Sequence, residues 1–385
     1  MNVLLVAAAR PNFMKVAPVL AALERSGVDA TMVHTGQHYD SNMSDAFFLD
    51  LGMRRPDVNL GCSGSSHAQT TASVMLAFDD VVVEREPDVV MVVGDVDSTL
   101  ACALVAAKRN VPVAHVEAGL RSRDRTMPEE VNRVVVDALS DWLFTPSPDA
   151  TENLVREGVD PQRIHWVGNV MADSLLATLR TLDVDTYLTG YTVDRGSYAL
   201  MTLHRPSNVD DVSILVSLLS AVADVSQQVP VLFPVHPRTA PQLRLPEVQR
   251  VLRSAPEIRL LPPIGYRDCV ALQAGAALVL TDSGGLQEET TILGVPCLTL
   301  RETTERPITV TEGTNTVVGT SPEVIVEAAS QALAMRDVAR TPPIGWDGRA
   351  AERVVEALQS VPAPLDAQRQ RPAARLALRD KVRLA

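Results

Sequence analysis

Short apolar runs alternate along the chain with longer segments of helical periodicity. In the first half, such runs occupy residues 2–8, 30–35, 88–93, 111–116 and 142–145. In the second half, they occupy residues 198–203, 231–235, 258–261, 276–281 and 293–300. Runs of Val and Leu bounded by turn residues are typical of strands buried on both faces. Their alternation with helices predicts an α/β protein with parallel sheets.

The length and the break near the middle predict two domains. A chain of 385 residues exceeds what one ordinary hydrophobic core organises. Gly168 and Asn169 separate the two series of strands, so we expect a hinge there. The predicted units are residues 1–168 and 169–361, two Rossmann-like, doubly wound domains that face a cleft. Residues 362–385 form a basic, Arg- and Ala-rich tail.

Composition excludes several classes of function. The net charge of −12 argues against a general nucleic-acid-binding protein. The four cysteines have no paired spacing, which predicts a reduced, cytoplasmic protein. No apolar run is long enough to span a membrane, and the first residues lack the pattern of a signal peptide. The histidines show no metal-binding spacing, so we expect no metal.

Charged residues follow three of the apolar runs in the first half. Arg10, Asp95 and Glu117 each stand just past the carboxyl end of a predicted strand, and Lys15 lies one helical turn after Arg10. Ligands of open α/β sheets bind at that edge, so the three together predict a site. Glu129 follows a proline that opens a helix. That is also an ordinary helix start, and both interpretations stay open.

In the second half, residues 281–290 read TDSGGLQEET and lie between the apolar runs 276–280 and 293–300, which predicts a strand, a Gly-rich turn, a helix and a strand. Ser283, Gly284 and Gly285 stand where the helix begins, and its free N–H groups and positive dipole suit a phosphate. Glu289 lies in the first turns, where a carboxylate can accept hydrogen bonds from ribose hydroxyls. An ordinary capped helix is the alternative interpretation.

His204 and His236 follow two further strands of the second half and are expected to face the same cleft. One wall of the cleft then carries acids, and the other carries an anion socket. That division suits a nucleotide sugar, with diphosphate and ribose on the second domain and the sugar chemistry on the first.

Seven motifs in order make the chain resemble the non-hydrolysing UDP-N-acetylglucosamine 2-epimerases, which have a glycosyltransferase-B-like fold. The motifs are ARPNFMKVAP, VVGDVDST, HVEAGLRS, MPEEVNR, TLHRPSN, TDSGGLQEET and TTERP. The resemblance implies reversible conversion of UDP-N-acetylglucosamine to UDP-N-acetylmannosamine. It further implies elimination of UDP through a 2-acetamidoglucal without a cofactor, in a homodimer.

The resemblance also implies roles for individual residues. Proton transfer on both faces of C2 calls for positioned acid and base groups. The expected catalytic residues are Asp95, Glu117, Glu129 and His204. The expected substrate-binding residues are Arg10, Lys15, His236, Ile264, Tyr266, Ser283, Gly284, Gly285, Glu289 and Arg306, with Ile264 and Tyr266 near the uracil.

The sequence departs from the family pattern at a few positions. Asn12 replaces a common Glu, and Asp97 stands where Asn or Thr is usual. A second, regulatory substrate site of bacterial members is matched in part by Gln37, His38 and Gln69. The residues after His38 differ from the commoner form, so activation by substrate stays open.

Other functions fit part of the same pattern. A retaining glycosyltransferase of the same fold would leave the three carboxylates of the first half without a task. A hydrolysing epimerase, a catalytically inactive nucleotide-sugar sensor, and a 2-epimerase of a related sugar, such as a 2,3-diacetamido uronic acid nucleotide, also remain open.

Overall fold

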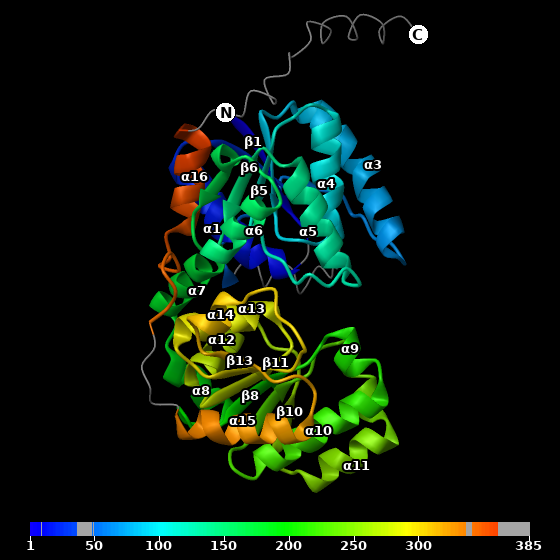
Figure 1. Ribbon diagram of the computed structural model, residues 1–385, viewed down its shortest axis with the longest axis vertical. Coiled ribbons are helices and arrows are strands. Elements are labelled where there is room, and N and C mark those ends of the chain that lie inside the picture. The colour runs from blue at the N-terminus through cyan, green and yellow to red at the C-terminus, as the bar shows by residue number, and fades with distance from the viewer. Residues whose placement is uncertain (9, 37–47, 49, 336–340, 361–385) are drawn as a thin grey trace, which may run out of the picture.

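The computed structural model describes all residues except 9, 37–47, 49, 336–340 and 361–385, and it describes no side chains for Arg10 and Pro11. The chain forms two α/β units, one above the other in Figure 1. Each unit has one wholly parallel sheet with helices on both faces. The predicted fold class is therefore confirmed.

The first sheet has seven strands in the order β3-β2-β1-β4-β5-β6-β7. Its strands are β1 (Asn2–Ala7), β2 (Asp29–His34), β3 (Val58–Asn59), β4 (Val89–Val93), β5 (Val113–Val116), β6 (Trp142–Thr145) and β7 (Ile164–Trp166). The helices of this part are α1 (Arg10–Arg25), α3 (His67–Arg85), α4 (Asp97–Lys108), α5 (Pro128–Leu139) and α6 (Pro148–Arg156), with a 3₁₀ turn at Pro161–Arg163.

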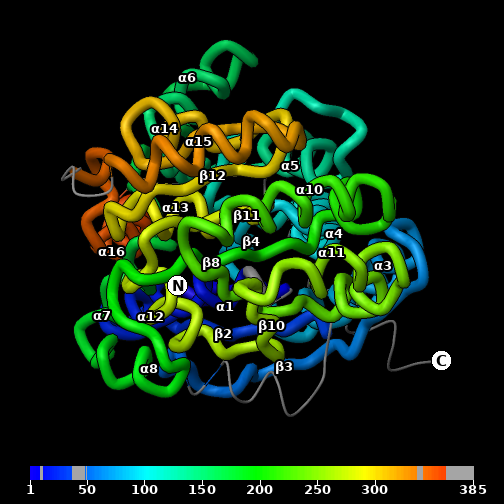
Figure 2. The backbone as a smooth tube through the Cα atoms, turned by 90° about the horizontal axis from the view of Figure 1, so that it is seen from below, coloured from blue at the N-terminus to red at the C-terminus, as the bar shows by residue number. Residues whose placement is uncertain are grey.

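The second sheet has six strands in the order β10-β9-β8-β11-β12-β13. Its strands are β8 (Ala199–Thr202), β9 (Val231–Pro234), β10 (Ile258–Leu261), β11 (Leu278–Thr281), β12 (Cys297–Thr299) and β13 (Asn315–Val317). Its helices are α8 (Val184–Tyr191), α9 (Pro206–Val209), α10 (Val212–Ser226), α11 (Pro246–Ser254), α12 (Tyr266–Gly275), α13 (Gly284–Leu293), α14 (Ile308–Thr311) and α15 (Pro322–Ala334), with a 3₁₀ turn at Gln242–Arg244. Figure 2 views this unit from below, with α10, α11 and α15 over its outer face.

Both sheets are buried on two faces, which explains their continuous apolar strands. In β1, Val3 and Leu5 pack toward α1, while Leu4 and Val6 pack toward α3 and α4. In each sheet the strand order reverses beside the first strand, between β1 and β4 and between β8 and β11. Ligands of doubly wound sheets bind at such switch points. The loops after these strands, which carry most of the predicted site residues, therefore occupy the two binding edges.

The chain passes between the two units twice. Helix α7 (Val170–Thr181) follows the predicted hinge, and α16 (Ala350–Ser360) returns to the first unit. The apolar side chains of α16 join the core around β1 and α1, beside which α16 lies in Figure 1. The predicted second domain, 169–361, is thus wrong for its last helix, because α16 completes the core of the first unit. Where the two passages meet, Gly168 packs directly on Gly345.

No helix within the described ranges is long and apolar enough to cross a membrane. Two helices, α7 and α8, follow the predicted hinge at Gly168 and Asn169, in a stretch for which the sequence pattern predicted no element. Both pack against the faces of other helices, α7 on α1 and α8 on α12, so tertiary contacts decide their position.

Candidate active site

Asp95 and Glu117 lie at the carboxyl ends of the adjacent strands β4 and β5, as the sequence predicted. The Asp95 carboxylate is 2.5 Å from a guanidinium nitrogen of Arg133 on α5. Arg133 is buried and also pairs with Glu130 at 2.8 Å. Arg133 belongs to the MPEEVNR motif, so its charge and position were visible in the sequence although its task was not.

Glu117 is held in an uncommon backbone conformation, with φ of 73°. Residues other than glycine rarely adopt this left-handed region, and such strain is concentrated at functional sites. Its carboxylate forms an ion pair with the buried Lys15. Gly94 makes room for this group, since a Cβ there would lie 3.4 Å from the Glu117 carboxylate and 3.1 Å from the Asn12 amide.

Glu129 and Glu130 are adjacent in sequence and differ in environment. Glu130 is buried and accepts hydrogen bonds from the backbone N–H groups of Ser122 and Arg123, both at 2.9 Å. Glu129 is half-buried, and its carboxylate has no hydrogen-bond partner among the described residues. Glu130 thus fixes the loop before α5, whereas Glu129 takes no part in holding that loop.

His204 follows β8 on the opposite wall, and its Nδ1 lies 2.9 Å from the carboxylate of the buried Asp282. Asp282 also accepts the backbone N–H groups of His204 and Arg205. Burial alone would raise the pKa of Asp282, but these hydrogen bonds outweigh it, and the pKa is lowered. The ring of His236 is 5.4 Å from that of His204. Sequence reasoning gave Asp282 no role, although it lies within TDSGG.

The socket for an anion lies at the start of α13. Ser283 is the N-cap residue, and Gly284 and Gly285 form the first turn, as predicted. A Cβ on Gly284 would lie 2.5 Å from a guanidinium nitrogen of Arg306. The missing side chain therefore lets Arg306 lie against the positive end of the helix, beside its free N–H groups.

Glu289 lies deeper in the same helix and is almost fully buried. Gln273 on α12 donates a hydrogen bond of 2.7 Å to one carboxylate oxygen. The other oxygen lies near the Tyr266 hydroxyl, which acts to lower the pKa of Glu289 although the two groups do not form a well-aligned hydrogen bond. Burial raises the pKa of Glu289 to about 7. Gln273 was not identified from the sequence; Ile264 lies, half-buried, just before α12.

Arg306 joins the two walls. Its guanidinium lies 2.8 Å from Glu117 of the first unit. It also lies 3.0 Å from Glu288 and 2.5 Å from Glu305 of the second unit. The sequence predicted Arg306 as a donor to substrate, whereas in this structure the guanidinium contacts carboxylates on all sides.

Some predicted residues lie outside this cluster or outside the described structure. Arg10 begins α1, and its side chain is not described; Gln37 and His38 lie outside the described residues. Gln69 is exposed on α3, and its side-chain oxygen accepts hydrogen bonds from Ser65. Within the residues that the structure covers, no group of three or more His, Cys, Asp or Glu side chains is arranged to hold a metal ion.

Comparison with known proteins identifies the family. The model of the UDP-N-acetylglucosamine 2-epimerase family matches residues 21–359. A UDP-N-acetylglucosamine 2-epimerase of Methanocaldococcus jannaschii is 38% identical over 364 residues, covering 93% of this chain and 99% of that protein. The chain belongs to the UDP-N-acetylglucosamine 2-epimerase family. The UDP-2,3-diacetamido-2,3-dideoxy-D-glucuronate 2-epimerase of Pseudomonas aeruginosa is 39% identical to this chain. The alignment covers 93% of this chain and 99% of that protein.

Solved structures of the family share the whole architecture. The archaeal epimerase in complex with UDP-GlcNAc and UDP superposes with a TM-score of 0.86 at 38% identity, covering 93% of this chain and 99% of that chain. Another structure of the archaeal enzyme superposes with a TM-score of 0.76 at 37% identity, with the same coverage of both chains. The two values differ for one protein, so this chain is closer to the arrangement in the complex. A glycosyltransferase of Rickettsia africae, 10% identical with a TM-score of 0.56, shares the fold alone.

Proposed function

We propose that the protein interconverts UDP-N-acetylglucosamine and UDP-N-acetylmannosamine by elimination and re-addition of UDP. The observation that carries the proposal is the pair of carboxylates, Asp95 and Glu117, which face the N-terminus of α13 across the domain junction with Arg306 between them. Family membership supports the substrate class. The archaeal relative was solved with UDP-GlcNAc and UDP.

The chemistry follows from this division of groups. A carboxylate takes the C2 proton while the C1–O bond breaks, and its electron pair leaves with UDP. The intermediate is the 2-acetamidoglucal. UDP then re-adds at C1 while an acid returns a proton to the opposite face of C2. Asp95, Glu117 and Glu129 are the proposed acid/base groups. His204, Arg306 and the first turn of α13 stabilise the charge that develops on UDP.

Proton exchange at C2 tests this proposal directly. In heavy water, we expect UDP-N-acetylglucosamine to gain deuterium at C2 while UDP-N-acetylmannosamine forms beside it. Glu117→Gln should suppress both together, because an amide of the same shape cannot accept the proton. Product formed without deuterium at C2 would exclude elimination, and transfer of the sugar to an acceptor would favour a glycosyltransferase.

A second substrate is supported by the Pseudomonas relative, which is as similar to this chain as the archaeal one. The substrate in its name differs from UDP-N-acetylglucosamine at C3 and C6 of the sugar. Both substrates carry the 2-acetamido group and UDP, so the residues above serve either. Product analysis on a panel of UDP-sugars distinguishes the two, since only the true substrate should give rapid exchange at C2.

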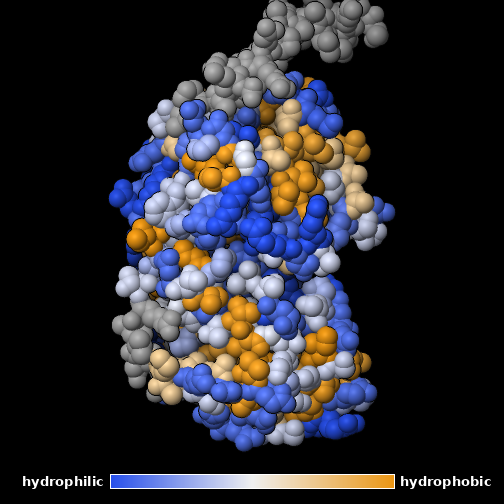
Figure 3. Space-filling view, in the orientation of Figure 1, coloured by the Kyte–Doolittle hydropathy of each residue, from blue (hydrophilic) through white to orange (hydrophobic). Residues whose placement is uncertain are grey.

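The proposed setting is a homodimer in the cytoplasm. In support of the dimer, Val131, Val134 and Val135 of α5 are between 36% and 40% exposed. Figure 3 shows an apolar area on the upper right of the molecule, where Figure 1 places α5. Contiguous exposed apolar surface is typical of protein interfaces. In support of the compartment, all four cysteines are free thiols.

A further inference from the structure

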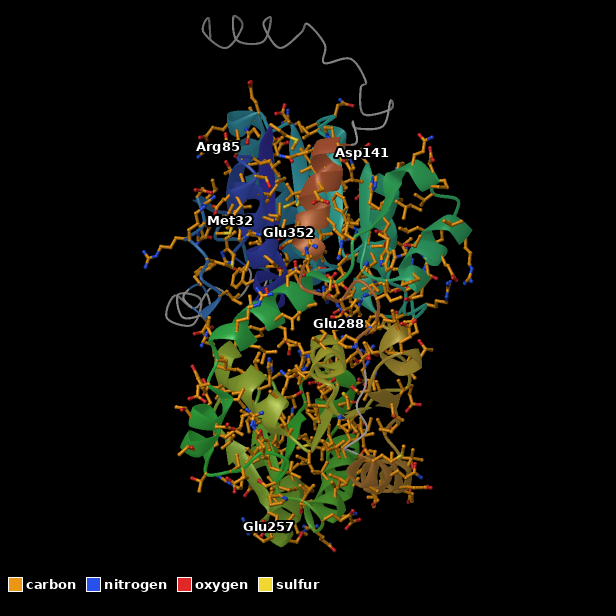
Figure 4. All side chains as sticks on the ribbon, turned by 90° about the vertical axis from the view of Figure 1, so that its left-hand side faces the viewer. Met32, Arg85, Asp141, Glu257, Glu288 and Glu352 are labelled. Atoms are coloured by element: carbon orange, nitrogen blue, oxygen red, sulfur yellow. The ribbon has the colours of Figure 1, made fainter. Side chains whose placement is uncertain are left out.

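Glu288 is a buried carboxylate at the junction between the two units, where Figure 4 labels it. It lies on α13, one residue before Glu289, but points to different partners. One oxygen accepts a hydrogen bond of 2.9 Å from the Asn169 amide, and the other lies 3.0 Å from Nε of Arg306. Glu288 therefore bridges the hinge and the arginine that contacts Glu117.

The Arg306 guanidinium lies among three carboxylates, and its Nε faces Glu288 as an ion pair without an aligned hydrogen bond. Its three nitrogens face three different carboxylates, those of Glu288, Glu305 and Glu117. A guanidinium is planar, so a shift of one contact tilts the other two. The Glu288 contact thereby sets the direction from which Arg306 approaches Glu117. Glu117 in turn is held on its other oxygen by Lys15.

Asn169 ties this cluster to the passage between the units. Its side-chain oxygen caps α7 by accepting the N–H of Met171 at 2.9 Å, which leaves its amide N–H₂ for Glu288. The preceding Gly168 has φ of 86° and packs on the returning chain at Gly345. A rotation at this passage would therefore move the amide that holds Glu288.

Burying the Glu288 carboxylate costs free energy unless its charge is compensated by partners. An isolated carboxylate loses its hydration when buried, and this raises the pKa of Glu288, while Arg306 opposes the rise. Glu305 faces Arg306 but also pairs with Arg301 at 2.8 Å, so its charge is shared between two arginines. Glu288 therefore contributes both charge and a fixed contact on the Nε side of Arg306.

We infer that Glu288 is a positioning residue, which through Arg306 places the Glu117 carboxylate for proton transfer only while the hinge at Asn169 holds the two units together. The inference rests on the proposed epimerisation. It assigns Glu288 no contact with the substrate. Its removal should therefore change turnover and leave substrate binding largely intact.

The variant Glu288→Gln tests the inference, because it keeps the shape and brings an amide toward Arg306 in place of a charge. We expect kcat to fall about tenfold to a hundredfold, the range found when a side chain that orients a metal ligand is removed. KM and the dissociation constant of UDP should stay within about twofold. Glu312→Gln, at an exposed glutamate of the same unit, is the matched control and should behave as wild type.

A second variant approaches the same link from the hinge. Asn169→Ser keeps a good N-cap for α7 but removes the amide that reaches Glu288. If both residues act through one path, the double variant should be no slower than Glu288→Gln alone, because their effects are coupled. A purely structural role would lower the unfolding temperature and give additive losses. The Asn169→Ser result decides the matter if Glu288→Gln does not fold.

Three results would overturn the inference. They are unchanged kcat in the folded variants, equal losses in kcat and UDP affinity, and additive effects of Asn169→Ser and Glu288→Gln. The two levels of the proposal fail differently. If the wild-type protein incorporates deuterium at C2 and the Glu288→Gln variant does so equally fast, only the inference about Glu288 is wrong. Wild-type protein that exchanges none defeats the epimerisation and the inference with it.

Discussion

Substrate affinity should depend on pH through Glu289. If the ribose hydroxyls donate to this carboxylate, the substrate binds the ionised form. Burial raises the pKa of Glu289 to about 7. Near neutral pH, the Glu289 carboxyl group is therefore protonated in a large fraction of the protein molecules. The ionised form prevails above the pKa and is lost as the pH falls through 7. Affinity should therefore be highest in mild alkali and decline toward pH 6.

The magnitude follows from the fraction of ionised carboxylate. With a pKa of about 7, that fraction is about 0.9 at pH 8 and about 0.1 at pH 6, so the apparent dissociation constant should rise about tenfold. Tenfold corresponds to about 1.4 kcal/mol of binding free energy. Binding at pH 7 should also release about half a proton, since the complex holds the carboxylate ionised.

Isothermal titration calorimetry with UDP-N-acetylglucosamine measures both quantities. The Glu117→Gln background prevents turnover, and the diphosphate of this ligand, unlike that of free UDP, has no terminal phosphate that titrates near neutrality. Titrations in two buffers of different ionisation enthalpy give the number of protons released. A further Glu289→Gln substitution should weaken binding at pH 8 and abolish the pH dependence.

Two results would refute this reasoning. A dissociation constant that is flat from pH 6 to pH 8 would remove Glu289 from the ribose site or place its pKa elsewhere. An unchanged slope in the Glu289→Gln variant would assign the dependence to another group. A group that bound the diphosphate better when protonated would act with the opposite sign, so it cannot imitate the expected trend.

The remaining predictions concern His204 and the surface of α5. Asp282→Asn removes the charge that orients His204, so kcat should fall about a hundredfold, as when an orienting partner is lost, while calorimetry shows UDP affinity nearly unchanged. A kcat within about twofold of wild type would leave Asp282 without this role. Val134→Glu places a charge within the proposed dimer contact, and light scattering should then report a monomer. Val155→Glu, at an exposed valine of α6, is the control; a dimer in both variants would move the interface elsewhere.

Much of the site was predictable because parallel strands bring their carboxyl ends to one edge. Asp95 and Glu117 needed only that rule and the strand boundaries. Ser283, Gly284 and Gly285 needed only the start of a helix. In these cases a short stretch of sequence identifies the strand end or helix start, and the fold class then places that point at the edge of the sheet.

The contacts between distant segments were not predictable from local pattern. Arg306 reaches Glu117 across 189 residues of sequence, and no periodicity encodes which acid it meets. The difference between Glu129 and Glu130 likewise depends on which carboxylate the preceding loop folds over. Gln273 is one polar residue of an otherwise ordinary helix, and its partner Glu289 lies on another.

The return of α16 bears on how the protein is made. Ala350, Val354 and Leu358 fill the core around β1 and α1, although they are synthesised more than three hundred residues later. Domains usually fold as units while the chain leaves the ribosome, the N-terminal one first. Here the second unit can complete its core while the first still exposes an apolar groove along α1. The unit that is begun first is thus finished last, and a nascent chain that stalls before residue 350 would present that groove to chaperones.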